Sequence, residues 1–301
     1  MTKSLLVFLL LITGYLNSLP ILASQCVPDG QWLLPKNGNI LNQHEFLDQM
    51  PLEGVVLLGE HHANAAHHKW QLETIKSLHE NQPNMTIGLE MFPRHVQPIL
   101  DQWISGDIDK YQLLELTDWD TIWSFNFDDY LPIFVYAQNN QIPLIALNIS
   151  RKLLDRVNES GWHGIPKNER EGVSNPARPS RAYAQSLAIS FKRHRPETRV
   201  IDKIGFKRFV QKQLLWDRAM AEGIANAHKQ DNKQLIISLM GSWHIIGGHG
   251  VPYQLEDLGI NTVVKLVPWD NNLSCDSINR QFSDAIFGTT YQQTISLDVF
   301  N

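Results

Sequence analysis

Short runs of apolar residues alternate along the chain with longer stretches in which apolar residues recur every three or four positions. The apolar runs contain no alternating polar residues, which is typical of strands buried on both faces of a parallel sheet. We expect five such strands, at residues 55–59, 86–90, 142–148, 235–241 and 262–267. Because strands and helical stretches follow one another in turn, the sequence predicts an α/β fold, a parallel sheet flanked by helices.

The helical stretches fall between these strands. The first is expected to begin after Asn64, a residue type that caps helix N-termini well, and to place His68, Leu72, Ile75 and His79 on one face. Further helices are expected at residues 131–139, 150–158, 182–193 and 206–228, and a long Gly- and Pro-rich loop at 161–181. We expect one domain from residue 24 to 301, with a small helical insertion subdomain at about 150–230.

The overall composition is that of a globular protein. The 301 residues are 43% hydrophobic, and the net charge of −5 gives no reason to expect nucleic acid as a partner. The segment from Arg151 to Lys212 differs, because it holds fifteen Lys or Arg and six Asp or Glu residues. Such a charge run is usually a solvated helical surface, and the alternative is a basic arm or lid that meets an anionic ligand.

The first residues predict export. Lys3 precedes the apolar run LLVFLLLI, and the small-residue stretch ILAS follows, as in a secretory signal peptide ending at residue 23. The apolar run is short for a membrane-spanning helix. A lipoprotein signal has Gly, Ala or Ser before its cysteine, whereas Gln25 precedes Cys26 here. We therefore expect a periplasmic protein without an outer-membrane lipid anchor.

The chain contains two cysteines, Cys26 and Cys275. In an oxidising compartment they are expected to form a disulfide that joins the two ends of the mature chain. The alternative is two free thiols. Neither cysteine lies in a CxxC or zinc-ligand pattern, so neither predicts redox or zinc chemistry.

Polar side chains follow the predicted strands at the points where these end. They are Glu60 and His62 after the first strand, Glu90 at the end of the second, Asn148 at the end of the third, and His244 with His249 after the fourth. In an open parallel sheet, ligands bind in the crevice beyond the carboxyl ends of the strands. We therefore expect these side chains to meet at one edge of the sheet.

Several chemistries fit such an edge. The set Glu60, His62, Glu90 and His244 matches ligands of a divalent metal ion, and a carboxylate beside an imidazole also matches a general base for hydrolysis. A third role for an accessible His or Tyr is axial ligation of haem iron. The chain has no GxSxG, GxGxxG or GxxxxGK[ST] motif, so serine hydrolase, dinucleotide and P-loop functions are not expected. We expect His67 and His79 to be structural.

Five motifs occur together in a fixed order: GEHHANAAHHKWQ, GLEMFPRHVQPILDQWISG, IPLIALNISRKLLDRV, FVQKQLLWDRAMAEGIA and GSWHIIGGHGVPYQL. In these motifs, from about Gly54 to Leu266, the chain resembles the ChaN-like haem-binding lipoproteins. That family belongs to a wider group with erythromycin-esterase-like and TraB/Tiki-like proteins. The resemblance implies an exported haem-binding protein linked to iron acquisition, with haem-uptake machinery as a partner.

The resemblance also assigns residues. In the wider group the matching glutamates and histidines form an active site, which here comprises Glu60, His62, Glu90 and His244. ChaN-like patterns further share Asn64, His68, Asn148, Gln213 and Asp217, all present in this chain. One departure is Trp243, which replaces a small residue beside the last histidine and is expected to narrow the pocket.

We expect haem to lie against the helical insertion, because the strand-end crevice suits a small polar pocket better than a porphyrin. Tyr183 and His163 are the candidate axial ligands there, and Arg178 or Arg181 is expected to pair with propionates. His68 and Asn148 are expected to support the site. A flat, exposed haem favours burial between two subunits, so haem is expected to promote a homodimer. The alternatives are a metal-dependent hydrolase and a scaffold protein without chemistry.

Overall fold

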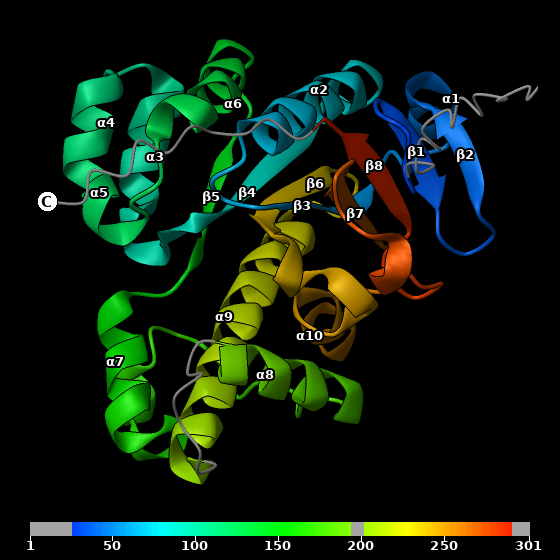
Figure 1. The fold of residues 1–301 in the computed structure, drawn as a ribbon. Helices are drawn as coiled ribbons and strands as arrows, with labels where there is room; N and C mark the ends of the chain where they lie inside the picture. Colours follow the sequence, from blue (N-terminus) through cyan, green and yellow to red (C-terminus); the bar gives the residue numbers. More distant parts are fainter. Residues whose placement is uncertain (1–25, 194–201, 291–301) are drawn as a thin grey trace, which may run out of the picture.

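The computed structural model describes residues 26–193 and 202–290. Its strands form one sheet in the order β2-β1-β8-β7-β3-β6-β4-β5 (Figure 1). The strands are β1 (Gln31–Leu34), β2 (Asn39–Asn42), β3 (Gly54–Glu60), β4 (Met85–Pro93), β5 (Leu144–Asn148), β6 (Leu235–Gly241), β7 (Val263–Asp270) and β8 (Ala285–Thr289). Neighbours from β8 to β5 pair in parallel, whereas β1 pairs antiparallel with β2 and β8. The predicted parallel sheet flanked by helices is confirmed.

All five predicted strands form, and β6 has the predicted bounds. The sequence interpretation missed β1, β2 and β8, which have four or five residues each and lie toward one edge of the sheet. Strands this short carry too few positions for a hydrophobic pattern to be recognised.

The helices lie on both faces of the sheet (Figure 1). They are α1 (Gln43–Leu47), α2 (Ala65–Asn81), α3 (Gln97–Ser105), α4 (Lys110–Thr117), α5 (Trp119–Ile122), α6 (Phe127–Asn139), α7 (Arg151–Ser160), α8 (Arg181–Arg193), α9 (Lys203–Gln230) and α10 (Val251–Asp257). The predicted start of α2 is confirmed, because the Asn64 side chain accepts a hydrogen bond from the Ala66 backbone N–H at 3.0 Å. None of the helices in the described ranges has both the length and the apolar character that crossing a membrane requires.

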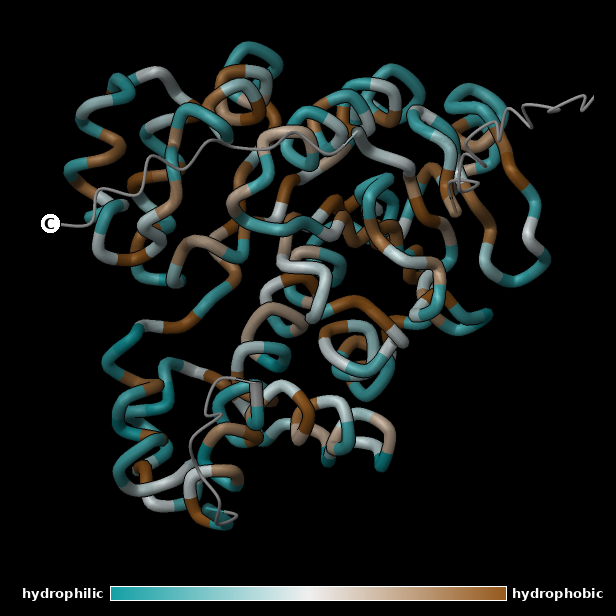
Figure 2. The backbone as a smooth tube through the Cα atoms, in the orientation of Figure 1, coloured by the Kyte–Doolittle hydropathy of each residue, from teal (hydrophilic) through white to brown (hydrophobic). Residues whose placement is uncertain are grey.

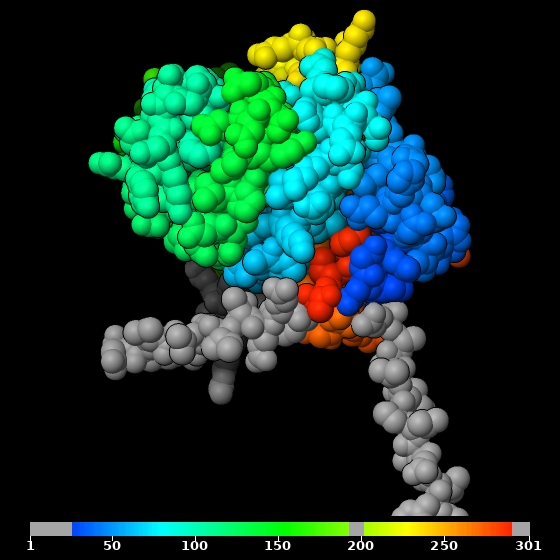
Figure 3. Space-filling view, turned by 90° about the horizontal axis from the view of Figure 1, so that it is seen from above, coloured from blue at the N-terminus to red at the C-terminus, as the bar shows by residue number. Residues whose placement is uncertain are grey.

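Two hydrophobic cores sandwich the sheet. Successive strand residues point to opposite faces, so Val56 and Leu58 join the core under α2, α3 and α6, whereas Val55 and Leu57 join the core under α9 and α10. Apolar segments accordingly concentrate at the centre of the molecule in Figure 2. Seen from above in Figure 3, α2 and α6 lie side by side over one face of the sheet. Burial on both faces explains why the central strands have no alternating polar residues.

The segment between β5 and β6, where a helical insertion is expected, carries α7, α8 and the 28-residue α9. The loop at 161–181 contains two short 3-10 turns and is fastened to α9 and α10. Arg218 of α9 donates to Ser174 Oγ at 2.9 Å and to Asp257 Oδ2 at 2.6 Å, and the Ala177 N–H donates to Gln254 Oε1 at 2.9 Å. These contacts fix the loop beside the carboxyl edge of the sheet.

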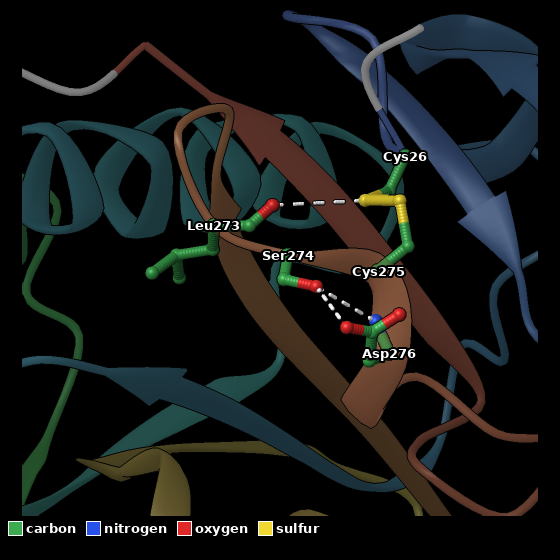
Figure 4. Close-up of a disulfide and its surroundings, with 5 residues drawn as sticks. All are labelled: Cys26, Leu273, Ser274, Cys275 and Asp276. Carbon is green, nitrogen blue, oxygen red and sulfur yellow. Dashed lines mark hydrogen bonds between the residues drawn. A yellow bond between two sulfur atoms is a disulfide. The ribbon is translucent and has the colours of Figure 1, made fainter. Parts of the chain in front are cut away.

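Cys26 and Cys275 form the predicted disulfide, with their Cα atoms 5.4 Å apart (Figure 4). It joins the segment before β1 to the loop between β7 and β8, across a separation of 249 residues. The same loop carries Leu273, whose carbonyl oxygen lies 3.7 Å from the Cys26 sulfur. The disulfide therefore holds this loop close to the sheet. The predicted signal peptide lies outside the described residues.

Candidate functional site

The carboxyl ends of the parallel strands bring the predicted polar side chains together, as expected. Glu60 is the last residue of β3, and it pairs in register with Gly241 at the end of β6. Glu90 lies in β4, and Asn148 at the end of β5 donates to the Glu90 carbonyl oxygen at 2.9 Å. His244 lies in the short 3-10 turn that follows β6. These side chains form two clusters, one around each glutamate.

The first cluster surrounds the buried carboxylate of Glu60. Its Oε1 lies 2.7 Å from His62 Nδ1 and accepts a hydrogen bond from the Tyr130 hydroxyl at 2.8 Å. Its Oε2 accepts from Gln71 Nε2 at 3.0 Å and lies 3.6 Å from Nε2 of the buried His68. The His68 ring also lies against Tyr130, with centroids 3.9 Å apart. Glu60 thus orients His62 and is itself held from α2 and α6.

The surroundings of Glu60 favour its ionised form. Burial alone would raise the pKa of Glu60, but the neighbouring imidazoles of His62 and His68 hold it well below its ordinary value. Burial alone would lower the pKa of His62, whereas the hydrogen bond to Glu60 and the charges of Glu90 and Glu60 raise it. The result is a carboxylate–imidazole pair in which His62 Nδ1 is hydrogen-bonded to Glu60, whereas His62 Nε2 makes no hydrogen bond to a described residue.

The second cluster surrounds His244, which lies between two carboxylates. Its Nδ1 is 2.6 Å from Asp217 Oδ1 and its Nε2 is 3.3 Å from Glu90 Oε1. Asp217 of α9 accepts a further hydrogen bond from the Tyr183 hydroxyl at 2.6 Å, and Glu90 Oε2 accepts one from the Gly241 N–H at 2.6 Å. Both nitrogens of His244 are therefore occupied.

These neighbours keep His244 charged at neutral pH. Burial would lower the pKa of His244, but the charge of Glu90 and the hydrogen bond to Asp217 raise it to about 10. In turn, burial would raise the pKa of Glu90, and the His244 charge is the largest influence that lowers it below its ordinary value. Burial and the charge of Asp217 raise the pKa of Tyr183. The second cluster is a buried imidazolium with two carboxylate partners and a neutral phenol.

The two clusters meet at Gly241. A Cβ atom at this position would lie 3.0 Å from His62 Cε1 and 3.7 Å from Glu90 Oε2, so glycine leaves room for the His62 ring beside β6. On its other side the ring contacts Trp123 edge-on at 4.5 Å and Phe125 at 5.2 Å, measured between centroids. Backbone and aromatic rings thus fix where His62 Nε2 points.

Two clefts open on either side of this centre, and His62, Gln213 and His244 line both. The first, here the α7 cleft, has a volume of about 510 Å³ and lies between α7, α9 and the turn that joins α5 to α6. The second, here the α8 cleft, has a volume of about 900 Å³ and lies between α8, α9, the turns after β6 and the loop after β7. Residues of α9 line both clefts.

The α8 cleft is the more aromatic and apolar of the two. Its walls include Leu187, Phe209, Trp243, Trp269, Leu273 and Phe282. Trp243, expected to narrow the pocket, lines this cleft with 70% of its surface exposed. Tyr183 and His249 lie beside each other in the same cleft, with ring centroids 6.0 Å apart.

The structure separates the predicted haem-binding residues. Tyr183 is buried and lines the α8 cleft, whereas His163, Arg178 and Arg181 are exposed and line neither cleft. The predicted supporting residues lie on the other side, since Asn148 lines the α7 cleft and His68 is buried behind Glu60. His163, Arg178 and Arg181 therefore remain candidates only for a ligand that extends beyond the clefts.

Two residues that support Glu60 were missed in the sequence, and a third, His249, was given no role of its own. Tyr130 and Gln71 hold Glu60 from helices distant from β3, and no sequence spacing indicates that contact. His249 was recognised only as a residue after a strand. Burial lowers the pKa of His249, so its ring is neutral at pH 7, and it forms no hydrogen bond to a described residue. The GGHG motif, a histidine flanked by flexible glycines, was the available signal.

The metal-ligand prediction for Glu60, His62, Glu90 and His244 is not supported by the geometry. Among the described residues, no three His, Cys, Asp or Glu side chains form a group able to hold a metal ion. The donor atoms are instead paired with one another, as the two clusters show. His67 and His79 are structural, as expected: His67 Nε2 lies 3.1 Å from Asp270 Oδ1, and His79 Nδ1 lies 3.0 Å from the Tyr136 hydroxyl.

Comparison with known proteins identifies the fold. A solved structure of ChaN of Campylobacter jejuni, which shows cofacial haem binding, has a TM-score of 0.68 at 20% identity and covers 85% of this chain and 95% of that one. An erythromycin esterase, EreC, in its open conformation has a TM-score of 0.45 at 14% identity, over 79% of this chain and 77% of its own. The latter similarity is too low to support an argument about function.

A curated plant protein, RETICULATA-RELATED 5 of Arabidopsis thaliana, is 27% identical over 112 residues, which is 36% of this chain and 15% of that protein. The sequence pattern of the family described as haem-binding uptake, Tiki superfamily, ChaN matches residues 46–255. That range contains both clusters and most of the walls of both clefts. The chain therefore belongs to the ChaN family of haem-binding uptake proteins within the Tiki superfamily.

Proposed function

We propose that this protein binds haem in the α8 cleft and takes part in haem or iron acquisition as an exported protein. The observation that carries the proposal is the combination of the ChaN family pattern with a cleft of about 900 Å³ that has aromatic walls and a histidine with no hydrogen bond to a described residue. A porphyrin requires wide apolar walls, an axial donor and polar groups at its rim. The α8 cleft offers these features in larger measure than the α7 cleft.

His249 fits the role of axial donor. Its ring is neutral and half-buried. The ring lies over Gly247, because a Cβ atom added to this glycine would be 3.0 Å from His249 Nε2. A neutral imidazole nitrogen without a hydrogen-bond partner is the form that ligates iron. Tyr183, the donor predicted from the sequence, lies beside it, but its hydroxyl donates to Asp217 at 2.6 Å. Iron ligation by Tyr183 requires loss of that hydrogen bond.

The test is a hemin titration of the mature protein, followed by the Soret band. We expect His249→Ala to weaken binding at least tenfold, Tyr183→Phe to weaken it less, and His163→Ala to have no effect. His95→Ala is the matched control, because His95 is exposed and lines neither cleft. If His249→Ala binds hemin as tightly as the parent and Tyr183→Phe loses hemin binding, Tyr183 is the axial ligand instead. No Soret shift in the parent protein would refute haem binding.

Export and dimer formation are further parts of the proposal. The Cys26–Cys275 disulfide supports export, because disulfides persist in oxidising compartments. The exposed Trp243 at the mouth of the α8 cleft supports burial of haem between two copies. Cell fractionation is expected to place the protein in the periplasm, and light scattering is expected to show a doubled mass when hemin is added. A cytosolic protein, or a monomer at saturating hemin, would contradict these parts.

A second candidate function is hydrolysis with His62 as a general base. The observation that favours it is the buried Glu60, which holds His62 Nδ1 at 2.7 Å while Nε2 has no partner among the described residues. Hydrolysis of a chromogenic ester by metal-free protein, lost in His62→Gln and kept in His95→Gln, would support this candidate. Equal background rates in all three proteins would remove it.

A further inference from the structure

The α7 cleft has the composition of a second ligand site. Trp123 and Phe125, from the turn between α5 and α6, form one wall, and Trp216 of α9 lies on the other side. Its volume of about 510 Å³ falls in the range of small-molecule sites. Aromatic side chains of this kind hold planar rings by stacking and edge contacts. The aromatic walls indicate a ligand with a planar apolar body.

Two basic residues in this cleft form no ion pair with a described acidic residue. Arg151, the first residue of α7, donates through Nη2 to the Thr121 carbonyl oxygen at 3.2 Å, and Lys212 of α9 makes no ion pair or hydrogen bond to a described residue. Other arginines of the same helices are paired, for example Arg156 with Glu169 and Arg218 with Asp257. Arg151 and Lys212 are therefore available to an anionic ligand.

The acidic residues of the cleft do not cancel this charge. Glu90 already accepts from the Gly241 N–H and pairs with His244, whose charge it shares with Asp217. Asp155 is exposed and opposes one of the two cations. His62 lines the same space. Among the side chains that line the cleft, Arg151, Lys212 and the imidazolium of His244 are positive and Glu90 and Asp155 are negative, so the lining carries one more positive than negative charge, which favours an anionic ligand.

We propose that the α7 cleft binds a planar aromatic carboxylate smaller than haem. Arg151 and Lys212 hold the carboxylate, and Trp123, Phe125 and Trp216 hold the ring. Arginine suits this task because its planar guanidinium pairs with a carboxylate through two parallel hydrogen bonds. The site is distinct from the proposed haem site, since only His62, Gln213 and His244 line both clefts.

The test compares two probes of equal shape, 2-naphthoate and the neutral 2-naphthamide, by calorimetry on the full mature protein. We expect naphthoate to bind at least tenfold more tightly than naphthamide. Arg151→Gln and Lys212→Gln should each weaken naphthoate binding about tenfold, as expected for loss of one charged hydrogen bond, and leave naphthamide unchanged. Lys152→Gln is the matched control, because Lys152 is exposed on the same helix and lines neither cleft.

Equal affinity for the two probes, or no loss in either variant, would overturn the proposal. A second measurement separates it from haem binding: naphthoate is titrated into protein already saturated with hemin. We expect the affinity for naphthoate to be unchanged. Loss of naphthoate binding would show that the α7 cleft is part of the haem site, and would overturn the proposal of a separate carboxylate site. If the parent protein binds naphthoate but no hemin, the haem proposal fails and the carboxylate site stands.

Discussion

The two strand-end clusters contain the same kinds of residue but hold their histidines differently. Glu60 contacts His62 through one ring nitrogen, the other makes no hydrogen bond to a described residue, and the side chain lines both clefts. Glu90 and Asp217 contact His244 through both nitrogens, so that ring is enclosed between carboxylates. Residue type and strand position therefore do not determine the role of a histidine here. The number of carboxylates around the ring does.

This difference assigns separate roles to the clusters. His62 can meet a ligand, because its side chain is 29% exposed and its Nε2 has no hydrogen bond to a described residue. His244 stabilises the fold, because its single positive charge is shared by two buried carboxylates that come from β4 and α9. Substitutions and pH titration at the two clusters test this assignment.

The largest effect is expected for His244→Ala. The substitution leaves Glu90 and Asp217 buried without their common partner, and breaking a buried pair in this way costs about 3–5 kcal/mol of unfolding free energy. His62→Ala should cost about 1 kcal/mol, since Glu60 keeps its hydrogen bonds from Tyr130 and Gln71. Urea denaturation measures both. Equal losses in the two variants would show that the clusters do not differ.

The pH dependence of stability is expected to distinguish the clusters next. The pKa of His244 is raised from 6.5 to about 10 in the folded state, so its stabilisation is complete below pH 6.5 and is lost as the pH rises through about 10. The loss should reach a few kcal/mol, on the order of 1.4 kcal/mol per unit of pKa. The pKa of His62 is also raised, so the sign is the same for that residue.

Comparison with His244→Gln isolates the His244 contribution. Denaturation at several pH values between 6 and 10 should give a steep alkaline decline for the parent and a shallow one for the variant. Parallel curves would mean that another group causes the alkaline decline. On the acid side both clusters should behave alike, because the pKa values of Glu60 and Glu90 are lowered and their stabilisation is lost as the pH falls below about 4.5.

A smaller effect is expected for Tyr130→Phe. The variant loses the hydroxyl that donates to Glu60 Oε1 at 2.8 Å, while His62 and Gln71 remain, so the cost should be about 1 kcal/mol. The negative charge of Glu60 is then less well compensated, because one hydrogen-bond donor is lost. The pKa of His62 should therefore rise, and NMR titration measures this pKa. Tyr136→Phe is the control on the same helix, because its hydroxyl meets His79 instead. An unchanged His62 pKa would show that Tyr130 does not act on the pair.

The smallest effect on stability is expected for Trp243→Ser. The side chain is 70% exposed, so unfolding free energy should change by no more than about 0.5 kcal/mol. Because Trp243 lines the α8 cleft, hemin affinity should nevertheless fall several-fold. Tyr111→Ser is the control, since Tyr111 is 77% exposed and lines neither cleft. Equal hemin affinity in both variants would exclude Trp243 from the haem site.

The sequence predicts the parts of the fold that depend on local patterns. The buried central strands, the Asn64 cap of α2 and the convergence of Glu60, Glu90 and His244 at one edge follow from hydrophobic runs and strand direction alone. The disulfide also follows, since the described residues contain no other cysteine to pair with Cys26 or Cys275.

The division between the two clusters does not follow from local patterns. It depends on Tyr130 reaching Glu60 across 70 residues and on Asp217 reaching His244 across 27 residues. Such contacts are fixed by how α6 and α9 pack on the sheet, which spacing within a helix does not reveal. The sequence therefore indicates a site with four acid–base groups, and the packing shows which nitrogen is free.

Haem is proposed to enter the α8 cleft at His249 while His244 stays enclosed. ¹⁵N NMR of histidine side chains, recorded at pH 8 with and without diamagnetic gallium protoporphyrin, tests this most directly. We predict that the His249 nitrogen signals shift on addition of the porphyrin, and that His244 keeps the signals of an imidazolium in both states. A neutral His244 at pH 8, or a porphyrin-induced shift at His244 without one at His249, would contradict the account.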